Sequence, residues 1–126
     1  MRINVPDLGL KLEYVQDYCG RYMSRPLEKP ELYALAQQLP DYRVYDAHYL
    51  GLDGDHHYHV MNTVDGGYHL LIALQATNRL TVLDTQPQRL KLETDSAVLT
   101  NRGILIETLP VSKTRTKFIH AHLRKI

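Results

Sequence analysis

Residues 52–71 read LDGDHHYHVMNTVDGGYHLL and carry most of the histidines of this 126-residue chain. The pair Asp53-Gly54 and the triplet Asp65-Gly66-Gly67 are typical of tight turns between strands. Between and after these turns, aromatic and aliphatic residues alternate with polar ones, and a period of two indicates a β-strand. The stretch therefore predicts antiparallel strands near residues 55–64 and 68–76.

The same alternation extends over most of the chain on both sides of this stretch. Further strands are expected at 43–52, 80–84, 89–93, 97–100, 103–109 and 116–125. Before residue 43 the apolar spacing favours helices instead, one over about 8–25 and one over about 30–39, each ended by a proline. We therefore expect one α+β domain over residues 1–126: an N-terminal helical hairpin followed by an antiparallel β-meander, as a curved sheet or a small barrel.

Turn geometry predicts which histidines share a face of the sheet. A two-residue turn at Asp53-Gly54 would set His48 opposite His59, and a three-residue loop at 65–67 would set Val60 opposite Ile72. The tyrosines then lie together on the apolar face. The other face collects five polar side chains: Asp46, His48, His57, His59 and His69.

Imidazoles two residues apart on a strand can bind one metal ion, because their side chains leave the same face. Asp46, His48, His57, His59 and His69 are thus candidate metal ligands, and a divalent ion is the one cofactor that the sequence suggests. No phosphate-binding glycine loop occurs. The alternative interpretation is a solvent-facing polar surface over a tyrosine-rich core.

The last predicted strand repeats the pattern and adds positive charge. His120, His122 and Arg124 alternate there with aliphatic residues, and the end of the chain is rich in lysine and arginine but has no acid. Such a surface favours an anionic partner. The candidate ligand-binding residues are His120, His122, Arg124, Lys113, Arg115 and Lys117.

Two local resemblances concern the histidine stretch. DGDHHYHVMNTVDGG at 53–67 is similar to the histidine motif of conjugative relaxases of the HUH endonuclease class. That resemblance implies a divalent ion on His57 and His59, and cleavage of single-stranded DNA by a helix tyrosine, for which the candidates are Tyr14, Tyr18 and Tyr22. GLDGDHHYH at 51–59 begins like the cupin motif, but no glutamate follows at the spacing that this motif requires.

The composition suits a small soluble protein of the cytoplasm. No apolar run approaches the roughly 20 residues of a membrane helix, and the single cysteine excludes an internal disulfide. Our first hypothesis is a non-catalytic binding or inhibitor protein, such as an accessory protein of a mobile element. It would bind a macromolecular partner or an anionic ligand through its histidine, tyrosine and arginine side chains, and self-associate through a sheet edge.

Two further hypotheses concern nucleic acids and phosphate esters. One is a metal-dependent nuclease or phosphoesterase that uses His57 and His59. The other is a nucleic-acid-binding module that uses the basic final strand. We expect a binding protein rather than an enzyme.

Overall fold

The computed structural model describes the backbone of the following residues: 2–10, 17–18, 22–52, 57–60, 67–75, 78–83, 88–91, 96–101, 103–108 and 116–126. The side chains that it describes lie within 2–10, 24–51, 67–74, 96–101 and 117–126. Three of the candidate site residues, Tyr14, Lys113 and Arg115, lie outside both sets of ranges. Four others, Tyr18, Tyr22, His57 and His59, are described by their backbone alone.

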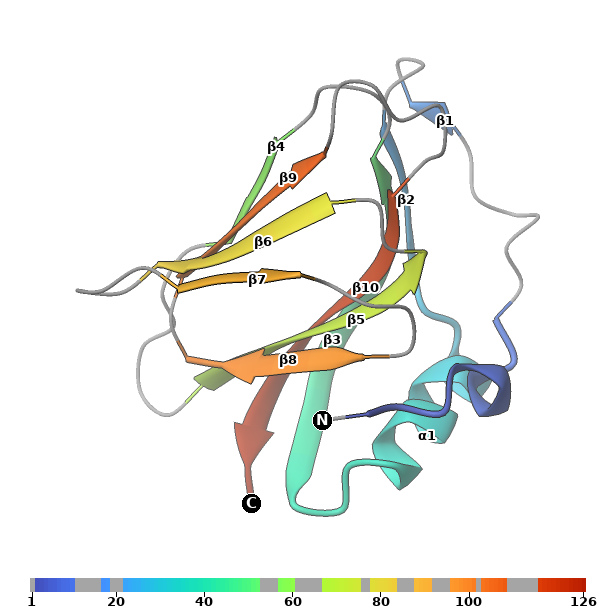
Figure 1. Cartoon of the computed structure of the whole chain (residues 1–126). Coiled ribbons are helices and arrows are strands. Elements are labelled where there is room, and N and C mark those ends of the chain that lie inside the picture. Colours follow the sequence, from blue (N-terminus) through green and yellow to red (C-terminus); the bar gives the residue numbers. More distant parts are fainter. Residues whose placement is uncertain are drawn as a thin grey trace.

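Most of the described chain is β-structure (Figure 1). A short 3-10 helix η1 (Val5–Leu8) and one α-helix, α1 (Lys29–Gln37), accompany the strands. The strands are β1 (Asp17–Tyr18), β2 (Tyr22–Pro26), β3 (Tyr42–Leu52), β4 (His57–Val60), β5 (Gly67–Gln75), β6 (Asn78–Leu83), β7 (Gln88–Lys91), β8 (Ala97–Thr100), β9 (Gly103–Thr108) and β10 (Thr116–Lys125).

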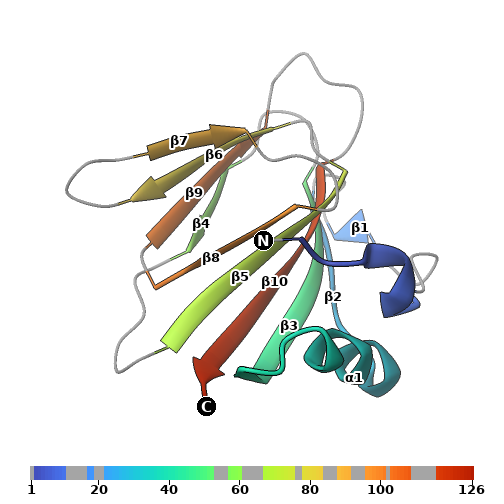
Figure 2. The same ribbon diagram turned by 60° about the horizontal axis from the view of Figure 1, so that its bottom comes forward.

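The strands form two antiparallel sheets that face each other (Figures 1 and 2). One sheet has the order β1-β2-β3-β10-β5-β8, and the other has the order β4-β9-β6-β7. The last strand, β10, pairs with β3 on one side and with β5 on the other. Strands far apart in the sequence are therefore neighbours, and the expected meander is wrong.

The expected N-terminal helical hairpin is also wrong. Within the range predicted as its first helix, Tyr18 lies on β1 and Tyr22 on β2, and the two residues pair across the strands. Tyrosine suits a pleated sheet at least as well as a helix, so pairing with β3 prevails over the helical spacing. The second predicted helix, 30–39, corresponds to α1.

All of the predicted strand segments after residue 43 contain a strand, but their pairing differs from the prediction. His48 faces His120 of β10 instead of His59. β4 pairs with β9 in the other sheet, and Ile72 of β5 pairs with Ile119 and Ala97 instead of Val60. The predicted turns would pair β3 with β4 and β4 with β5 as hairpins. In the structure β3 and β5 belong to the larger sheet, whereas β4 belongs to the smaller one.

The outer face of the larger sheet packs under η1 and α1. Leu35 of α1 is fully buried against a cluster that includes Ile119 and Ala121 of β10. A buried ion pair fixes α1 beside β2: the Arg25 guanidinium donates to both Glu31 carboxylate oxygens, at 2.7 and 2.8 Å. Glu31 Oε1 also accepts the backbone N–H of Glu28 at 2.7 Å, which orders the first turn of α1.

The inner face of the larger sheet points toward the second sheet. Strand alternation places Phe118 on this face, and Leu50 and Leu71 on neighbouring strands are buried with it. Nearer to the end of β10, the apolar residues of this face give way to histidines. Among the described residues, no helix is long and apolar enough to cross a membrane.

Candidate metal centre

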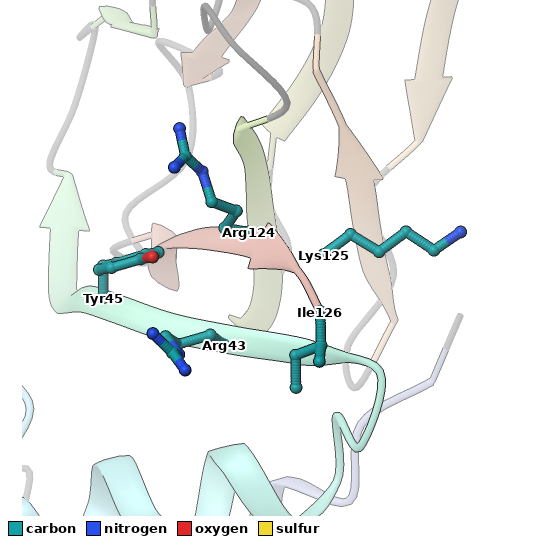
Figure 3. Close-up of a pocket in the computed structure, with 5 residues that line it drawn as sticks. All are labelled: Arg43, Tyr45, Arg124, Lys125 and Ile126. Carbon is teal, nitrogen blue, oxygen red and sulfur yellow. The ribbon is translucent and has the colours of Figure 1, made fainter.

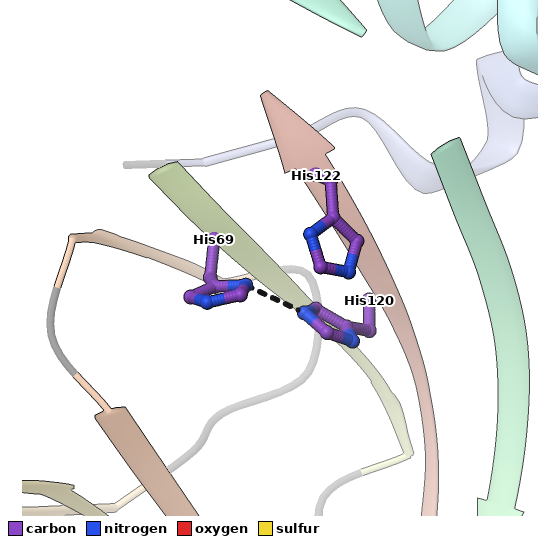
Figure 4. Close-up of side chains that lie close together, drawn as sticks. All are labelled: His69, His120 and His122. Atoms are coloured by element: carbon purple, nitrogen blue, oxygen red, sulfur yellow. Dashed lines mark hydrogen bonds between the residues drawn. The ribbon is translucent and has the colours of Figure 1, made fainter. Parts of the chain in front are cut away.

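Three histidines lie together on the inner face of the larger sheet (Figure 4). His120 and His122 leave the same side of β10 because they are two residues apart. His69 at the start of β5 is the direct partner of His122 in the antiparallel register. The cluster is thus built by two neighbouring strands whose outer faces hold the apolar core.

The ring nitrogens of this cluster are close enough to bind one ion. One nitrogen from each of the three rings lies within 4.8 Å of the others. His69 Nδ1 and His120 Nε2 are 2.9 Å apart and form a hydrogen bond. His69 and His120 are buried, whereas His122 is exposed, so the cluster has an open side.

Burial lowers the pKa of His120 to about 3, and positive charge on His122, His69 or His48 would lower it in the same direction. A buried imidazole beside other imidazoles loses its hydration without gaining a carboxylate, so the neutral form is favoured. His120 is therefore neutral at physiological pH. A neutral ring has a free electron pair on one nitrogen, and this is the state in which histidine binds metals.

Two further polar side chains flank the cluster on β3. His48 is the register partner of His120, and Asp46 is the partner of His122. His48 Nδ1 lies 3.4 Å from Asp46 Oδ1, and both side chains are about half exposed. The predicted common face of Asp46, His48 and His69 is therefore present, although β10 lies between β3 and β5.

The remaining predicted site residues are placed elsewhere or only by their backbone. His57 and His59 lie on β4 in the smaller sheet, paired with Glu107 and Leu105 of β9, and their side chains are outside the described part. Lys117 lies on β10 beside Gly51 and Gln75. The assignment of His57 and His59 as metal ligands stays a prediction.

The donor set fits a borderline transition metal. Imidazole nitrogens suit Zn²⁺, Fe²⁺, Ni²⁺ and Cu²⁺, whereas Mg²⁺ and Ca²⁺ prefer oxygen. Three protein ligands with an open position are typical of catalytic metal sites. A tetrahedral ion would separate the nitrogens by about 3.3 Å, so the 2.9 Å between His69 and His120 requires only a small opening.

The sequence identified these histidines but grouped them differently. His69 was expected beside His57 and His59, and His120 and His122 were expected to contact an anion. The H-x-H spacing of the last strand shows that His120 and His122 share a face. Adding His69 to this pair requires knowing that β10 lies beside β5, and the sequence pattern does not reveal that long-range pairing.

Comparison with known proteins identifies the fold. No protein-family model and no curated protein matches the sequence. Solved structures do match, and several of them are cupin domains. The Cnp3 cupin domain of Schizosaccharomyces pombe superposes with a TM-score of 0.57 at 14% identity, covering 91% of this chain and 72% of that one.

Two other solved structures superpose with similar TM-scores. The Cupin_2 domain of an XRE family transcriptional regulator from Enterobacter cloacae superposes with a TM-score of 0.52 at 10% identity, covering 84% of this chain and 98% of that one. The iron(II) form of HppE with an alternative substrate has a TM-score of 0.52 at 15% identity, covering 87% of this chain and 53% of that one. This chain therefore has the cupin fold.

The cupin motif requires a glutamate after the H-x-H pair, and this sequence has none at that spacing. The absence of this glutamate therefore did not predict the fold correctly. The H-x-H pair of the similar motif, His57 and His59, lies on β4 of the smaller sheet. A two-sheet barrel depends on strand patterning and buried apolar residues, and one metal-ligand position contributes little to it.

Proposed function

We propose that this protein binds a divalent transition-metal ion through His69, His120 and His122, and that the ion acts on a small molecule that enters between the two sheets. The observation that carries the proposal is the cluster itself: three imidazoles on adjacent strands with ring nitrogens within 4.8 Å. When bound, such an ion supplies a Lewis acid, and if it is iron it also supplies redox chemistry.

The burial of His69 and His120 supports an ordered site. Both rings are held by the strands β5 and β10 that also form the core, so little side-chain freedom is lost when a ligand binds. His122 completes the set at the solvent-facing edge. Because His122 is exposed, one side of the cluster meets solvent, and a small molecule can approach the rings from that side.

The hydrogen bond between His69 and His120 constrains the tautomers of the two imidazoles. Only one of the two facing nitrogens can carry the proton, while the other accepts. Metal binding by both nitrogens therefore requires one imidazole to move its proton to its other ring nitrogen. We expect ¹⁵N NMR of the two rings to show a tautomer change when the ion is added.

Asp46 and His48 support the site from β3. Their side chains lie on the same face, and the carboxylate of Asp46 is close enough to His48 to accept a hydrogen bond after a small movement. A carboxylate beside the cluster attracts a cation and can orient a neighbouring imidazole. We assign Asp46 and His48 to this supporting role.

The comparisons add support of a general kind. The HppE structure holds iron(II) with an alternative substrate, so this fold accommodates a metal with a small molecule in that protein. The resemblance to HUH enzymes requires a helix tyrosine, and Tyr18 and Tyr22 do not fit that role because they lie on strands, whereas Tyr14 lies outside the described residues. Binding without turnover remains the alternative outcome for the loaded protein.

Metal titration with two sets of variants tests the proposal. The chelator-treated protein is titrated calorimetrically with Zn²⁺, Mn²⁺, Fe²⁺ and Ni²⁺, and bound metal is quantified. His69→Gln, His120→Gln and His122→Gln should each weaken binding by more than about 100-fold, because even outer-shell changes cost 10–100-fold. His57→Gln and His59→Gln are the matched controls and should keep wild-type affinity.

The two sets of variants also define the result that would contradict the proposal. Loss of metal binding in His57→Gln and His59→Gln, with wild-type affinity in the other three variants, would place the metal on β4. Absence of metal binding in the wild-type protein would refute a metal site of either kind.

A further inference from the structure

A cationic pocket lies where the start of β3 meets the end of β10 (Figure 3). It has a volume of about 220 Å³ and is lined by Arg43, Tyr45, Arg124, Lys125 and Ile126. This volume suits a small molecule better than a polymer. Its lining includes three cationic side chains and one phenol.

Strand alternation relates this pocket to the histidine cluster. Arg124 is two residues beyond His122, so both side chains leave the same face of β10. Two residues along a strand advance about 7 Å, a distance that a small organic molecule can span. A molecule with its charged end at Arg124 would therefore have its other end near His122.

The register places like charges directly opposite each other. Arg43 is the cross-strand partner of Arg124. The two arginines therefore lie side by side on adjacent strands, where a single anionic group can contact both. Two guanidinium groups can each form paired hydrogen bonds to a carboxylate or a phosphate.

The ends of these two strands are held in position. The register of β3 against β10 shifts between His122 and Leu123, next to Tyr45 on β3. Tyr45 is 58% exposed and lines the pocket with its ring. Beyond Arg124, the backbone N–H of Ile126 donates to the carbonyl oxygen of Asp41 at 3.0 Å, which fixes the end of β10 beside the start of β3.

We infer that the pocket of Arg43, Tyr45 and Arg124 binds the anionic group of a small organic ligand, a carboxylate or a phosphate ester, whose other end reaches the metal held by the histidines. This inference rests on the proposed metal function and names the substrate class for it. Arg43 and Arg124 are the specificity-determining residues. The Tyr45 hydroxyl donates a further hydrogen bond to the anion.

Malonate and methyl phosphate are the probes, and they distinguish the two anion chemistries. Each is titrated by calorimetry into metal-free and metal-loaded protein at low ionic strength, because salt screens exposed charges. Arg43→Gln and Arg124→Gln should each weaken binding of the preferred probe by about tenfold. Their metal affinity should match that of the wild-type protein. Arg2→Gln, which removes an exposed arginine outside the pocket, is the matched control.

The outcomes separate failure of this inference from failure of the proposed function. Unchanged probe affinity in both arginine variants, with normal metal binding, overturns the inference and leaves the metal site intact. Absence of metal binding in the wild type refutes the proposed function. In that case the anion pocket is tested by comparing probe binding to the metal-free wild-type protein with probe binding to the metal-free arginine variants. Arginine-dependent binding of an oligonucleotide with no response to either probe also overturns the inference.

Discussion

The acid stability of the metal-free protein depends on His120. This imidazole is buried, and its folded-state pKa is lowered to about 3 from the ordinary value of 6.5. Between these two pH values the unfolded state binds a proton at His120 that the folded state does not bind. The free energy of unfolding must therefore fall as the pH falls from 6.5 toward 3, and it is insensitive to this group above pH 6.5.

The size of the effect follows from the two pKa values. One proton taken up only by the unfolded state changes the free energy of unfolding by about 1.4 kcal/mol per pH unit. Between pH 6 and pH 4, His120 alone then removes about 2–3 kcal/mol of stability. This loss is a large part of the total of about 5–15 kcal/mol that a domain of ordinary stability has.

Urea unfolding at several pH values between 4 and 7 measures this dependence. Carboxylates also titrate in this range, so the relevant quantity is the difference between wild-type protein and His120→Gln. His120→Gln cannot take up the proton, and its stability should fall less steeply toward low pH. His122→Gln keeps the buried imidazole but removes one of the charges that lower its pKa, so its pH dependence should lie between those of wild-type protein and His120→Gln.

Parallel pH curves for wild-type protein and His120→Gln would refute the reasoning. They would show that His120 takes up its proton in the folded state as readily as in the unfolded chain. His120 would then be solvent-accessible or paired with an acid, and the cluster geometry described above would be incorrect.

Three other substitutions test the packing that positions the site. Glu31→Gln removes the carboxylate that binds the largely buried Arg25 and should lower the free energy of unfolding by about 3–5 kcal/mol. Asp41→Asn makes the same carboxylate-to-amide change at an exposed position and should alter the free energy of unfolding by less than about 0.5 kcal/mol. Equal effects in urea melts would contradict the ion-pair assignment. Leu35→Ala should cost about 2–5 kcal/mol in the same assay, because this side chain is fully buried under the sheet. Gly9→Ala should lower the free energy of unfolding by about 1 kcal/mol, because the backbone of Gly9 is left-handed with a φ of 62° and an added Cβ would have no neighbour within 4 Å. A stabilising effect would contradict the positive φ.

Local patterns predicted the elements of this fold well and their arrangement poorly. Each strand from β3 to β10 and the helix α1 correspond to a segment predicted from alternation, turn residues and proline positions. The first predicted helix failed because Tyr18 and Tyr22 satisfied a helical spacing by coincidence, while pairing with β3 placed them on strands. Sequence periodicity indicates which face of a strand is apolar, but it does not indicate which other strand pairs with it.

The candidate site shows the same division. Alternation correctly placed Asp46, His48 and His69 on one face, and independently placed His120 with His122. It could not reveal that β10 inserts between β3 and β5, because nothing near residue 120 specifies a partner so far along the chain. The arginine pocket was missed in part for this reason, since Arg43 faces Arg124 only through that pairing.

The position of β10 has a consequence for how the candidate site forms. This strand lies between β3 and β5 in the larger sheet, and it carries two of the three clustered histidines. Before β10 inserts, β3 and β5 lack their shared neighbour, and only His69 of the three histidines is in place. The three imidazoles therefore come together in the same folding step that joins β3 to β5.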